Sequence, residues 1–293
     1  MNCARTLTSE LGGKWYRRYG VAPCPVCQPE GRKGQNALTV ADGDDGRLLL
    51  HCKKSGCTFR DIAAASGITR GSYTPPDPGE LARRRAEEQA EVVKRVAQAR
   101  HLWDAAAPVT GTLAETYLRG RGITCPLSQT LRFAPACWHP TARRFPALVA
   151  LVEGGGGFAV HRTYLRADGT GKAAVEPAKA MLGATAGGAV RLSEGVGRLV
   201  VAEGIETALA LSCGLLSGPA TIWSALSTSG IRALRLPDRP YKLTIAADGD
   251  IPGRDAAHAL AERAHALGWV VSLLPAPEGQ DWNDILNMKG KCA

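Results

Sequence analysis

The sequence has no long apolar run. None of its hydrophobic stretches approaches the roughly 20 residues that a membrane-spanning helix requires, and the first residues lack the apolar segment of a secretory signal. We therefore expect no membrane association and predict a cytoplasmic protein. The 293 residues, 45% of them hydrophobic, are enough for two modest domains or three small ones.

A phosphate-binding P-loop is also absent. The stretch Gly169-Thr-Gly-Lys172-Ala resembles the end of that motif. However, Arg166 stands where the first glycine belongs, and Ala173 replaces the Ser or Thr that binds Mg²⁺. Since the chain offers no other candidate, we expect no helicase motor.

The nine cysteines do not indicate a disulfide framework, because their number is odd and the chain shows no sign of secretion. Four of them form two pairs, Cys24-Pro-Val-Cys27 and Cys52-Lys-Lys-Ser-Gly-Cys57, on either side of a predicted β-hairpin with its turn at residues 42–46. Pairs arranged in this way bind one tetrahedral Zn²⁺ in closed structural sites. We predict a β zinc ribbon with these four ligands, and His51 as an alternative one.

Carboxylates follow two apolar runs in the last third of the chain. Glu203 comes after residues 198–202, and Asp248-Gly-Asp250 comes after residues 242–247. Here strand and helix patterns alternate, which predicts a parallel α/β sheet with strands at about 198–203, 220–225, 242–248 and 269–274. Ligands bind at the carboxyl ends of such strands. The three acids there either hold a divalent cation, which offsets their repulsion, or are ordinary polar caps.

The motifs Val-Val-Ala-Glu203-Gly204 and Ala-Asp248-x-Asp250 resemble those of the Toprim domain. Bacterial-type primases, type IA and II topoisomerases and some nucleases and recombination proteins share this domain. The resemblance implies a Rossmann-like fold and catalytic roles for Glu203, Asp248 and Asp250 around Mg²⁺ or Mn²⁺.

Further residues of this motif set are expected at the same site. Gly204 is expected to let the backbone turn tightly beside the cation, and Gly253 to open the next helix. Primases carry another Asp-containing metal motif where this chain has Gln280-Asp-Trp-Asn-Asp284. The resemblance therefore implies that either Asp281 or Asp284 completes the site.

Basic and aromatic side chains surround the cysteine pairs. Trp15, Tyr16, Tyr19 and Phe59 lie among cationic residues, a mixture suited to stacking unpaired bases while holding phosphates. The alternative is that the aromatic side chains form the core of a small domain, and we favour this for Phe59. The arrangement resembles the N-terminal zinc-binding module of phage and plasmid primases, which implies contacts with nucleic acid. The basic residues concerned are Lys14, Arg17, Arg18, Arg32, Lys33, Lys53, Lys54 and Arg60.

The net charge of +9 is unevenly distributed. Lys and Arg number 11 against 6 Asp and Glu in residues 1–75, and 16 against 11 in residues 76–195. In residues 196–293 they number 9 against 10. This pattern suits a polyanion that is held by the first two thirds and processed at an acidic site in the last third. A basic surface that only aids solubility would show the same excess.

Composition divides the chain into four expected parts. Residues 72–79 contain three prolines and one glycine and are predicted to be a linker. We predict a zinc ribbon at 1–72, a linker and helix at 73–107, a small α+β unit at 108–195 and a Toprim catalytic domain at 196–293. In the third part, Arg162, Lys172 and Lys179 resemble the basic residues that line the nucleic-acid and nucleotide path of bacterial-type primases.

The order of zinc module, basic middle part and Toprim domain resembles that of a DNA primase. This resemblance implies a single-stranded DNA template, ribonucleoside triphosphate substrates and a separate replicative helicase as partner. Two alternatives are a recombination mediator without catalysis, which would carry a helix-hairpin-helix that we do not find, and a Toprim nuclease. A topoisomerase is least expected, because it needs a nucleophilic tyrosine in a further domain.

Overall fold

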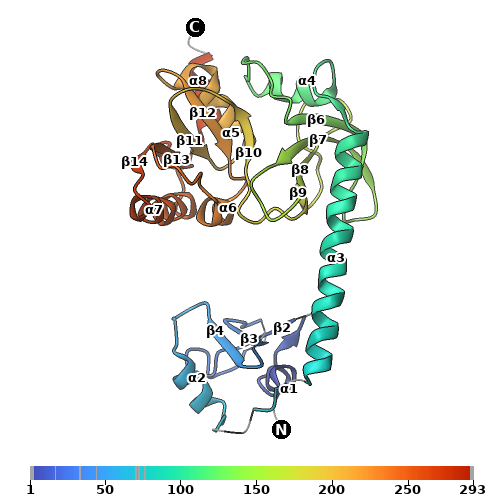
Figure 1. Ribbon diagram of the computed structural model, residues 1–293, viewed down its shortest axis with the longest axis vertical. Helices are drawn as coiled ribbons and strands as arrows, with labels where there is room; N and C mark the ends of the chain where they lie inside the picture. Colours follow the sequence, from blue (N-terminus) through green and yellow to red (C-terminus); the bar gives the residue numbers. More distant parts are fainter. Residues whose placement is uncertain are drawn as a thin grey trace. The chain divides into compact units, whose positions relative to one another are not determined.

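The computed structural model describes residues 3–16, 18–32, 34–43, 45–69, 71, 73–75 and 77–290. Arg17 and Lys33, two of the basic residues expected around the cysteines, lie outside this set. The chain forms two compact units, unit 1 (Met1–Ala90) and unit 2 (Glu91–Ala293). Helix α3 (Pro78–Ala105) begins in unit 1 and ends in unit 2 (Figure 1).

Unit 1 is built on a four-stranded antiparallel sheet in the order β1-β2-β3-β4. The predicted hairpin is confirmed as strands β3 and β4, with Leu38 opposite Cys52. Leu7, Leu38 and Ile62 form the centre of its small core. Its elements are α1 (Ala4–Glu10), β1 (Lys14–Trp15), β2 (Tyr19–Ala22), β3 (Leu38–Asp42), β4 (Leu48–Cys52) and α2 (Phe59–Ala65).

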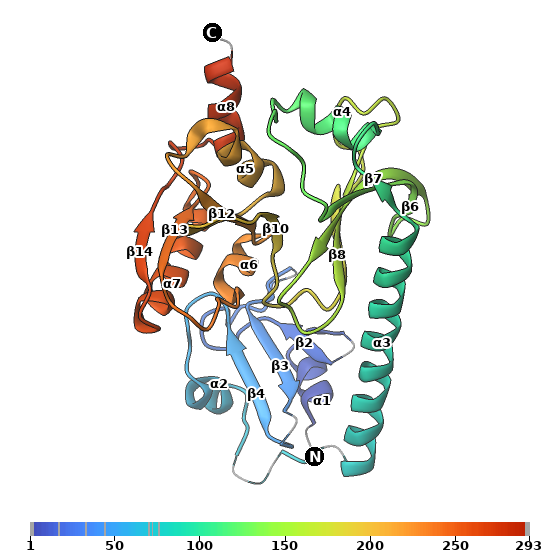
Figure 2. The same ribbon diagram turned by 45° about the horizontal axis from the view of Figure 1, so that its top comes forward.

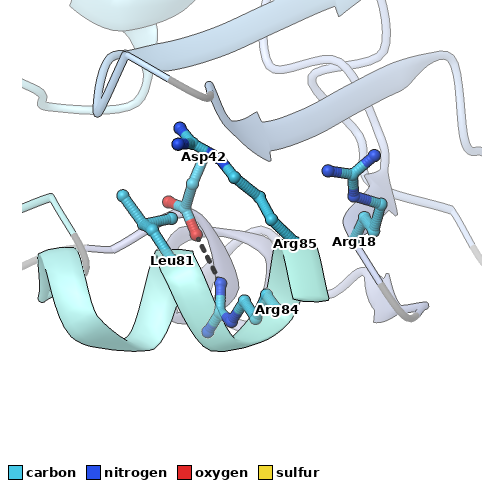
Figure 3. A pocket seen from close by; sticks show the side chains of 5 residues that line it. All are labelled: Arg18, Asp42, Leu81, Arg84 and Arg85. Atoms are coloured by element: carbon cyan, nitrogen blue, oxygen red, sulfur yellow. Dashed lines mark hydrogen bonds and ion pairs between the residues drawn. The ribbon is translucent and has the colours of Figure 1, made fainter. Parts of the chain in front are cut away.

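The carboxylate of Asp42 connects the sheet of unit 1 to the segments around it. The side chain is only 5% exposed, and its Oδ1 accepts hydrogen bonds from the Ala4 amide at 3.1 Å and the Tyr73 hydroxyl at 2.9 Å. Its Oδ2 pairs with Arg84 of α3 at 3.4 Å (Figure 3). One buried acid thus holds α1, residue 73 and the start of α3 on the sheet.

We predict that Asp42→Ala destabilises unit 1 by about 1–3 kcal/mol, because buried donors lose their acceptor. Native-state hydrogen exchange of strands β2 to β4 measures this. The control is Asp45→Ala, since Asp45 is largely exposed and pairs only at the surface with Arg47. Equal exchange rates in the two variants would contradict the role of Asp42.

The first half of unit 2 is an antiparallel sheet in the order β5-β6-β7-β8-β9. Ala99 and Trp103 of α3 pack on one face of it with Val160 and Tyr164, and helix α4 packs with Leu148 on the other face. This is the expected α+β unit, although β6 and β9 were not predicted. Its elements are β5 (Ala107–Pro108), α4 (Leu113–Gly120), β6 (Leu131–Trp138), β7 (Arg144–Val152), β8 (Ala159–Tyr164) and β9 (Lys179–Gly183).

The second half of unit 2 contains the predicted parallel sheet, in the order β10-β12-β11-β13-β14. Strands β11 to β14 pair in parallel, while β10, at the edge of the sheet, is antiparallel to β12. The strands are β10 (Val190–Ser193), β11 (Arg198–Ala202), β12 (Ala220–Ser224), β13 (Lys242–Ala246) and β14 (Val270–Leu273).

Helices cover both faces of this parallel sheet, as Figure 2 shows. Helix α5 packs on one face in a core that it shares with α4 and β7, so the two sheets of unit 2 have a common core. Helix α7 packs on the other face. The helices are α5 (Ile205–Ala210), which continues as the π-helix η1 (Leu211–Leu215), then α6 (Thr228–Ala233), α7 (Ile251–Ala266) and α8 (Trp282–Gly290). Within the described ranges, no helix combines the length and apolarity needed to cross a membrane.

Candidate functional site

Four of the predicted acids lie near one edge of the parallel sheet. Strands β11 and β13 are neighbours with Ala202 opposite Ala246, so Glu203 and Asp248 leave the sheet side by side. Burial, followed by the charges of Glu203, Asp281 and Asp250, raises the pKa of Asp248 to about 7. Burial is also the largest cause that raises the pKa of Glu203, and the charge of Asp250 is the second. These carboxylates therefore interact with one another.

Asp248 also has an unsatisfied atom. Its Oδ1 is buried and has no hydrogen-bond partner, which is costly for a carboxylate oxygen unless a donor or cation binds it. Oxygen ligands of this kind suit Mg²⁺ or Mn²⁺. The unpaired Asp248 oxygen therefore fits a divalent cation.

Asp250 is also the N-cap residue of α7. Its Oδ1 accepts a hydrogen bond from the Gly253 amide at 2.7 Å, and the helix begins at Ile251. Gly253 thus lies within the first turn, not at the helix start where we expected it. A Cβ at Gly253 would approach Asp250 Oδ1 to 2.8 Å, so the glycine leaves room for that carboxylate. Gly204 precedes α5 with φ of −90°, which other residues also adopt.

The structure distinguishes the two acids of the last motif. Asp281 is the one whose charge reaches Asp248. Its Oδ1 accepts the amides of Asn283 and Asp284 at 2.8 and 2.9 Å, while Asp284 Oδ2 accepts the Asp281 amide at 3.1 Å. The two side chains form a reciprocal cap at the start of α8. Asp281 lies toward the acidic edge, and Asp284 supports it.

Gly249, between the two aspartates, was missed as a site residue. Its amide donates to Gln280 O at 2.8 Å, and its carbonyl accepts from Gly279 at 3.1 Å. A Cβ here would lie 1.8 Å from Pro277 O. Only glycine permits this contact, which holds the loop of Asp248 against the loop that leads to Asp281.

The predicted basic residues Lys172 and Lys179 meet at Glu206, which was also missed. Their Nζ atoms lie 3.3 and 3.2 Å from the Glu206 carboxylate, and the Tyr117 hydroxyl donates to it at 2.6 Å. Burial opposes ionisation of Glu206, but the two lysines outweigh burial and hold its pKa well below the usual range. Lys179 also lowers the pKa values of Glu203 and Asp248. An ammonium group is thus held beside the acidic edge.

His161 and Arg162 lie on opposite faces of the antiparallel sheet, because successive side chains of a strand such as β8 point to opposite sides. His161 is near the lysine pair, and burial followed by the charge of Lys179 lowers its pKa to about 3, so it is neutral. Arg162 lies on the α3 side instead, where it donates to Trp138 O and Met181 O. The structure therefore does not bring Arg162 to the acidic edge with Lys172 and Lys179.

The four predicted cysteines converge in unit 1. Their sulfur atoms all lie within 4.8 Å of one another, and no other group of described His, Cys, Asp or Glu residues is this tight. Cys27 Sγ and Cys52 Sγ are 3.6 Å apart, close to the ~3.8 Å edge of a tetrahedral Zn–S₄ site. His51 is exposed on β4 and does not belong to the group.

The cysteine environment favours a bound cation. Burial opposes ionisation of Cys52, but the amides of Ser55, Cys57 and Lys54 outweigh it and lower the pKa to about 6. Burial and the neighbouring sulfurs raise the pKa of Cys57 to about 12. Four thiolates therefore cannot form together without a compensating charge, which a bound zinc ion would supply.

Basic and aromatic side chains are exposed on unit 1. Lys53 and Lys54 lie on the turn after β4 and are exposed. Tyr16 and Tyr19 are 45% and 42% exposed, and their rings stack with centroids 5.5 Å apart. Phe59 is 51% exposed, so our assignment of it to the mini-core was wrong. It lies on the outer side of α2, whose Ile62 faces the core.

Two family models match unit 2. Residues 93–192 match a domain of unknown function (DUF7146), and residues 198–292 match the Toprim domain. No curated protein matches the chain. The last part of the chain is therefore a Toprim domain, as the motifs at Glu203 and Asp248 predicted.

Three solved structures align with this chain. A DNA primase domain from Pseudomonas aeruginosa covers 67% of this chain and 75% of its own, with 18% identity and a TM-score of 0.42. The alignment with the zinc-binding and RNA polymerase domains of Aquifex aeolicus primase covers 98% of this chain and 80% of that structure, with 15% identity and a TM-score of 0.40. The alignment with the RNA polymerase domain of Mycobacterium tuberculosis primase covers 69% of this chain and 80% of that structure, with 18% identity and a TM-score of 0.39.

We predict that Cys52→Ser releases the metal and unfolds unit 1, while unit 2 stays folded on its own core. Metal analysis should return about one zinc per wild-type chain and none in the variant. Proteolysis should then cut within residues 1–90 only. Cys3→Ser is the control, because Cys3 lies outside the cluster. Full zinc occupancy in Cys52→Ser would contradict the assignment.

We predict that Asp248→Asn stabilises unit 2 at pH 8 in buffer without Mg²⁺ or Mn²⁺. The pKa of Asp248 is raised to about 7 from an unfolded value of about 4. Its protonation therefore stabilises the fold at low pH, and this contribution is lost as pH rises from about 4 through about 7. The uncharged amide avoids the loss.

Thermal unfolding followed by tryptophan fluorescence checks this prediction. The melting temperature of the variant should exceed that of wild type at pH 8 and equal it at pH 4. The control is Asp255→Asn, an exposed acid of α7. A constant difference at both pH values would show that repulsion at the acidic edge is not the cause.

Proposed function

We propose that this protein is a DNA primase, which synthesises short RNA primers on single-stranded DNA by metal-dependent nucleotidyl transfer. The observation that carries the proposal is the half-buried acidic edge of Glu203, Asp248 and Asp281 beside Lys179 in a Toprim domain. Nucleotidyl transfer needs both a cation site for the reacting phosphate and positive charge for the triphosphate. The acidic edge and the lysine beside it support nucleotidyl transfer as the activity.

The acids hold the divalent cation in this proposal. Asp248 and Asp250 are its ligands, and Asp281 adds negative charge from α8. Bound Mg²⁺ or Mn²⁺ supplies the charge that activates the attacking hydroxyl and neutralises the leaving pyrophosphate. Glu203 lies nearest the primer 3′ hydroxyl and accepts its proton on a carboxylate oxygen. At the same time the hydroxyl oxygen bonds to the α-phosphorus of the nucleotide, and the bond from the α-phosphorus to the pyrophosphate breaks.

The lysines orient the triphosphate. Lys179 and Lys172 are held by Glu206, so their ammonium groups enter the site in a fixed position at low entropic cost. Tyr117 donates to the same carboxylate and keeps it from turning toward the cation. Glu206 and Tyr117 are therefore positioning residues.

Unit 1 holds the template in this proposal. Zn²⁺ at Cys24, Cys27, Cys52 and Cys57 keeps the small sheet folded. The exposed Tyr16 and Tyr19 offer stacking surfaces for unpaired bases, and Lys53 and Lys54 offer charge for phosphates. A separate replicative helicase as partner stays a prediction from the family resemblance.

We predict that Glu203→Gln lowers primer synthesis at least about 100-fold while folding and template binding stay intact, because the lost interactions act on the transition state. Full-length protein is incubated with single-stranded DNA, Mg²⁺ and labelled ribonucleotides, and the oligomers are resolved on a gel. Glu262→Gln, an exposed acid of α7, is the control.

The same assay decides between the alternatives. Template-dependent oligoribonucleotides from wild type support the primase. Degradation of the DNA without synthesis would favour the nuclease, and DNA binding without either reaction would favour the recombination mediator. Wild-type synthesis rates in Glu203→Gln would remove this residue from the mechanism.

A further inference from the structure

A cavity of about 530 Å³ lies in unit 2 between the end of α3 and the antiparallel sheet. Gln98, His101, Leu102 and Ala105 of α3 form one wall. The sheet contributes Ala134 to Trp138 of β6, Arg144 of β7, Arg162 of β8 and Leu182 of β9. Because Arg162 and His161 are successive on β8, this cavity is on the face opposite to the lysine pair.

The cavity is positively charged. Its lining contains Arg144 and Arg162 and no Asp or Glu. Arg162 is 7% exposed and its Nε is buried without a partner, while its other nitrogens donate to the carbonyls of Trp138 and Met181. No carboxylate among the described residues pairs with this guanidinium. A buried charge without a counter-ion is costly, so an anion in the cavity would stabilise it.

The cavity also offers a flat aromatic surface. Trp138 is 53% exposed on its wall, with the Arg144 guanidinium 5.8 Å from the ring centroid. Leu102, Ala105 and Leu182 add apolar surface around it. An exposed indole beside an arginine suits a ligand that combines a planar ring with a negative group. The volume lies in the range of small-ligand sites.

We infer that this cavity binds a nucleotide, with the base on the Trp138 indole and the phosphate near Arg144 and Arg162. All of its lining residues lie within residues 93–192, which match the domain of unknown function. The site is separate from the acidic edge and requires no divalent cation. It therefore does not depend on the proposed primer synthesis. Its occupant is a nucleotide, either free or as one unit of a single strand.

The test uses the full-length, zinc-loaded chain in buffer without Mg²⁺, so that the acidic edge holds no metal-bound triphosphate. Binding of the fluorescent nucleotide mant-ATP is measured by anisotropy. Trp138→Leu and Arg144→Gln should each weaken binding at least about tenfold, because each removes one recognition element. Both side chains are exposed, so these variants are expected to fold, which circular dichroism checks.

The matched control is Arg143→Gln. Arg143 is the exposed neighbour of Arg144 but does not line the cavity, so its loss should change the affinity by less than about twofold. Displacement of mant-ATP by ATP or by oligothymidylate, compared at equal nucleotide concentration, identifies a free nucleotide or a strand as the source. The inference is overturned if mant-ATP does not bind, if Trp138→Leu and Arg144→Gln bind it as wild type does, or if Arg143→Gln weakens binding equally.

Discussion

Repulsion between neighbouring carboxylates, two of them half-buried, is the constraint on which the arrangement of unit 2 depends. Glu203 and Asp248 follow adjacent parallel strands, and the charges of Asp250 and Asp281 add to theirs. Burial itself disfavours the charges of Glu203 and Asp248. The fold therefore places acids where they are costly without a cation, which is the usual condition of a metal site and not of a stabilising surface.

The residues around the acids limit the electrostatic cost of holding these carboxylates together. Lys179 is the one nearby cation among the described residues that favours ionisation of both Glu203 and Asp248. It is fixed by Glu206, which is itself held by Lys172 and the Tyr117 hydroxyl. Tyr117 belongs to α4, Lys179 to β9 and Glu206 to α5, while Lys172 lies in the segment that precedes β9. The antiparallel sheet thus supplies the basic half of the site, and the parallel sheet supplies the acidic half.

Electrostatic repulsion also constrains unit 1, where it acts between the sulfur atoms of the four cysteines. Four thiols within 4.8 Å cannot all ionise unless a cation joins them. The sheet is small, and Leu7, Leu38 and Ile62 are the centre of its core. A metal bound by the cysteines therefore contributes a large share of the folding free energy of this unit.

The sequence predicted those features that depend on local pattern. Apolar runs that end on acids predicted the edge with Glu203 and Asp248, and the spacing of the cysteine pairs predicted their cluster. Contacts distant in sequence were not predictable. Glu206 meets Tyr117 across 89 positions, and Gly249 is needed only because the backbone at Pro277 passes close by. Asp281 and Asp284 have the same chemistry, and only the cap of α8 distinguishes their roles.

The central claim is that the acidic edge binds a divalent cation. Electron paramagnetic resonance of Mn²⁺ titrated into the zinc-loaded full-length chain measures this binding directly. The account predicts that wild type binds Mn²⁺ and that Asp248→Asn weakens the binding at least about tenfold, while Asp255→Asn leaves it unchanged. Equal Mn²⁺ binding by wild type and Asp248→Asn, or no binding by wild type, would contradict the account.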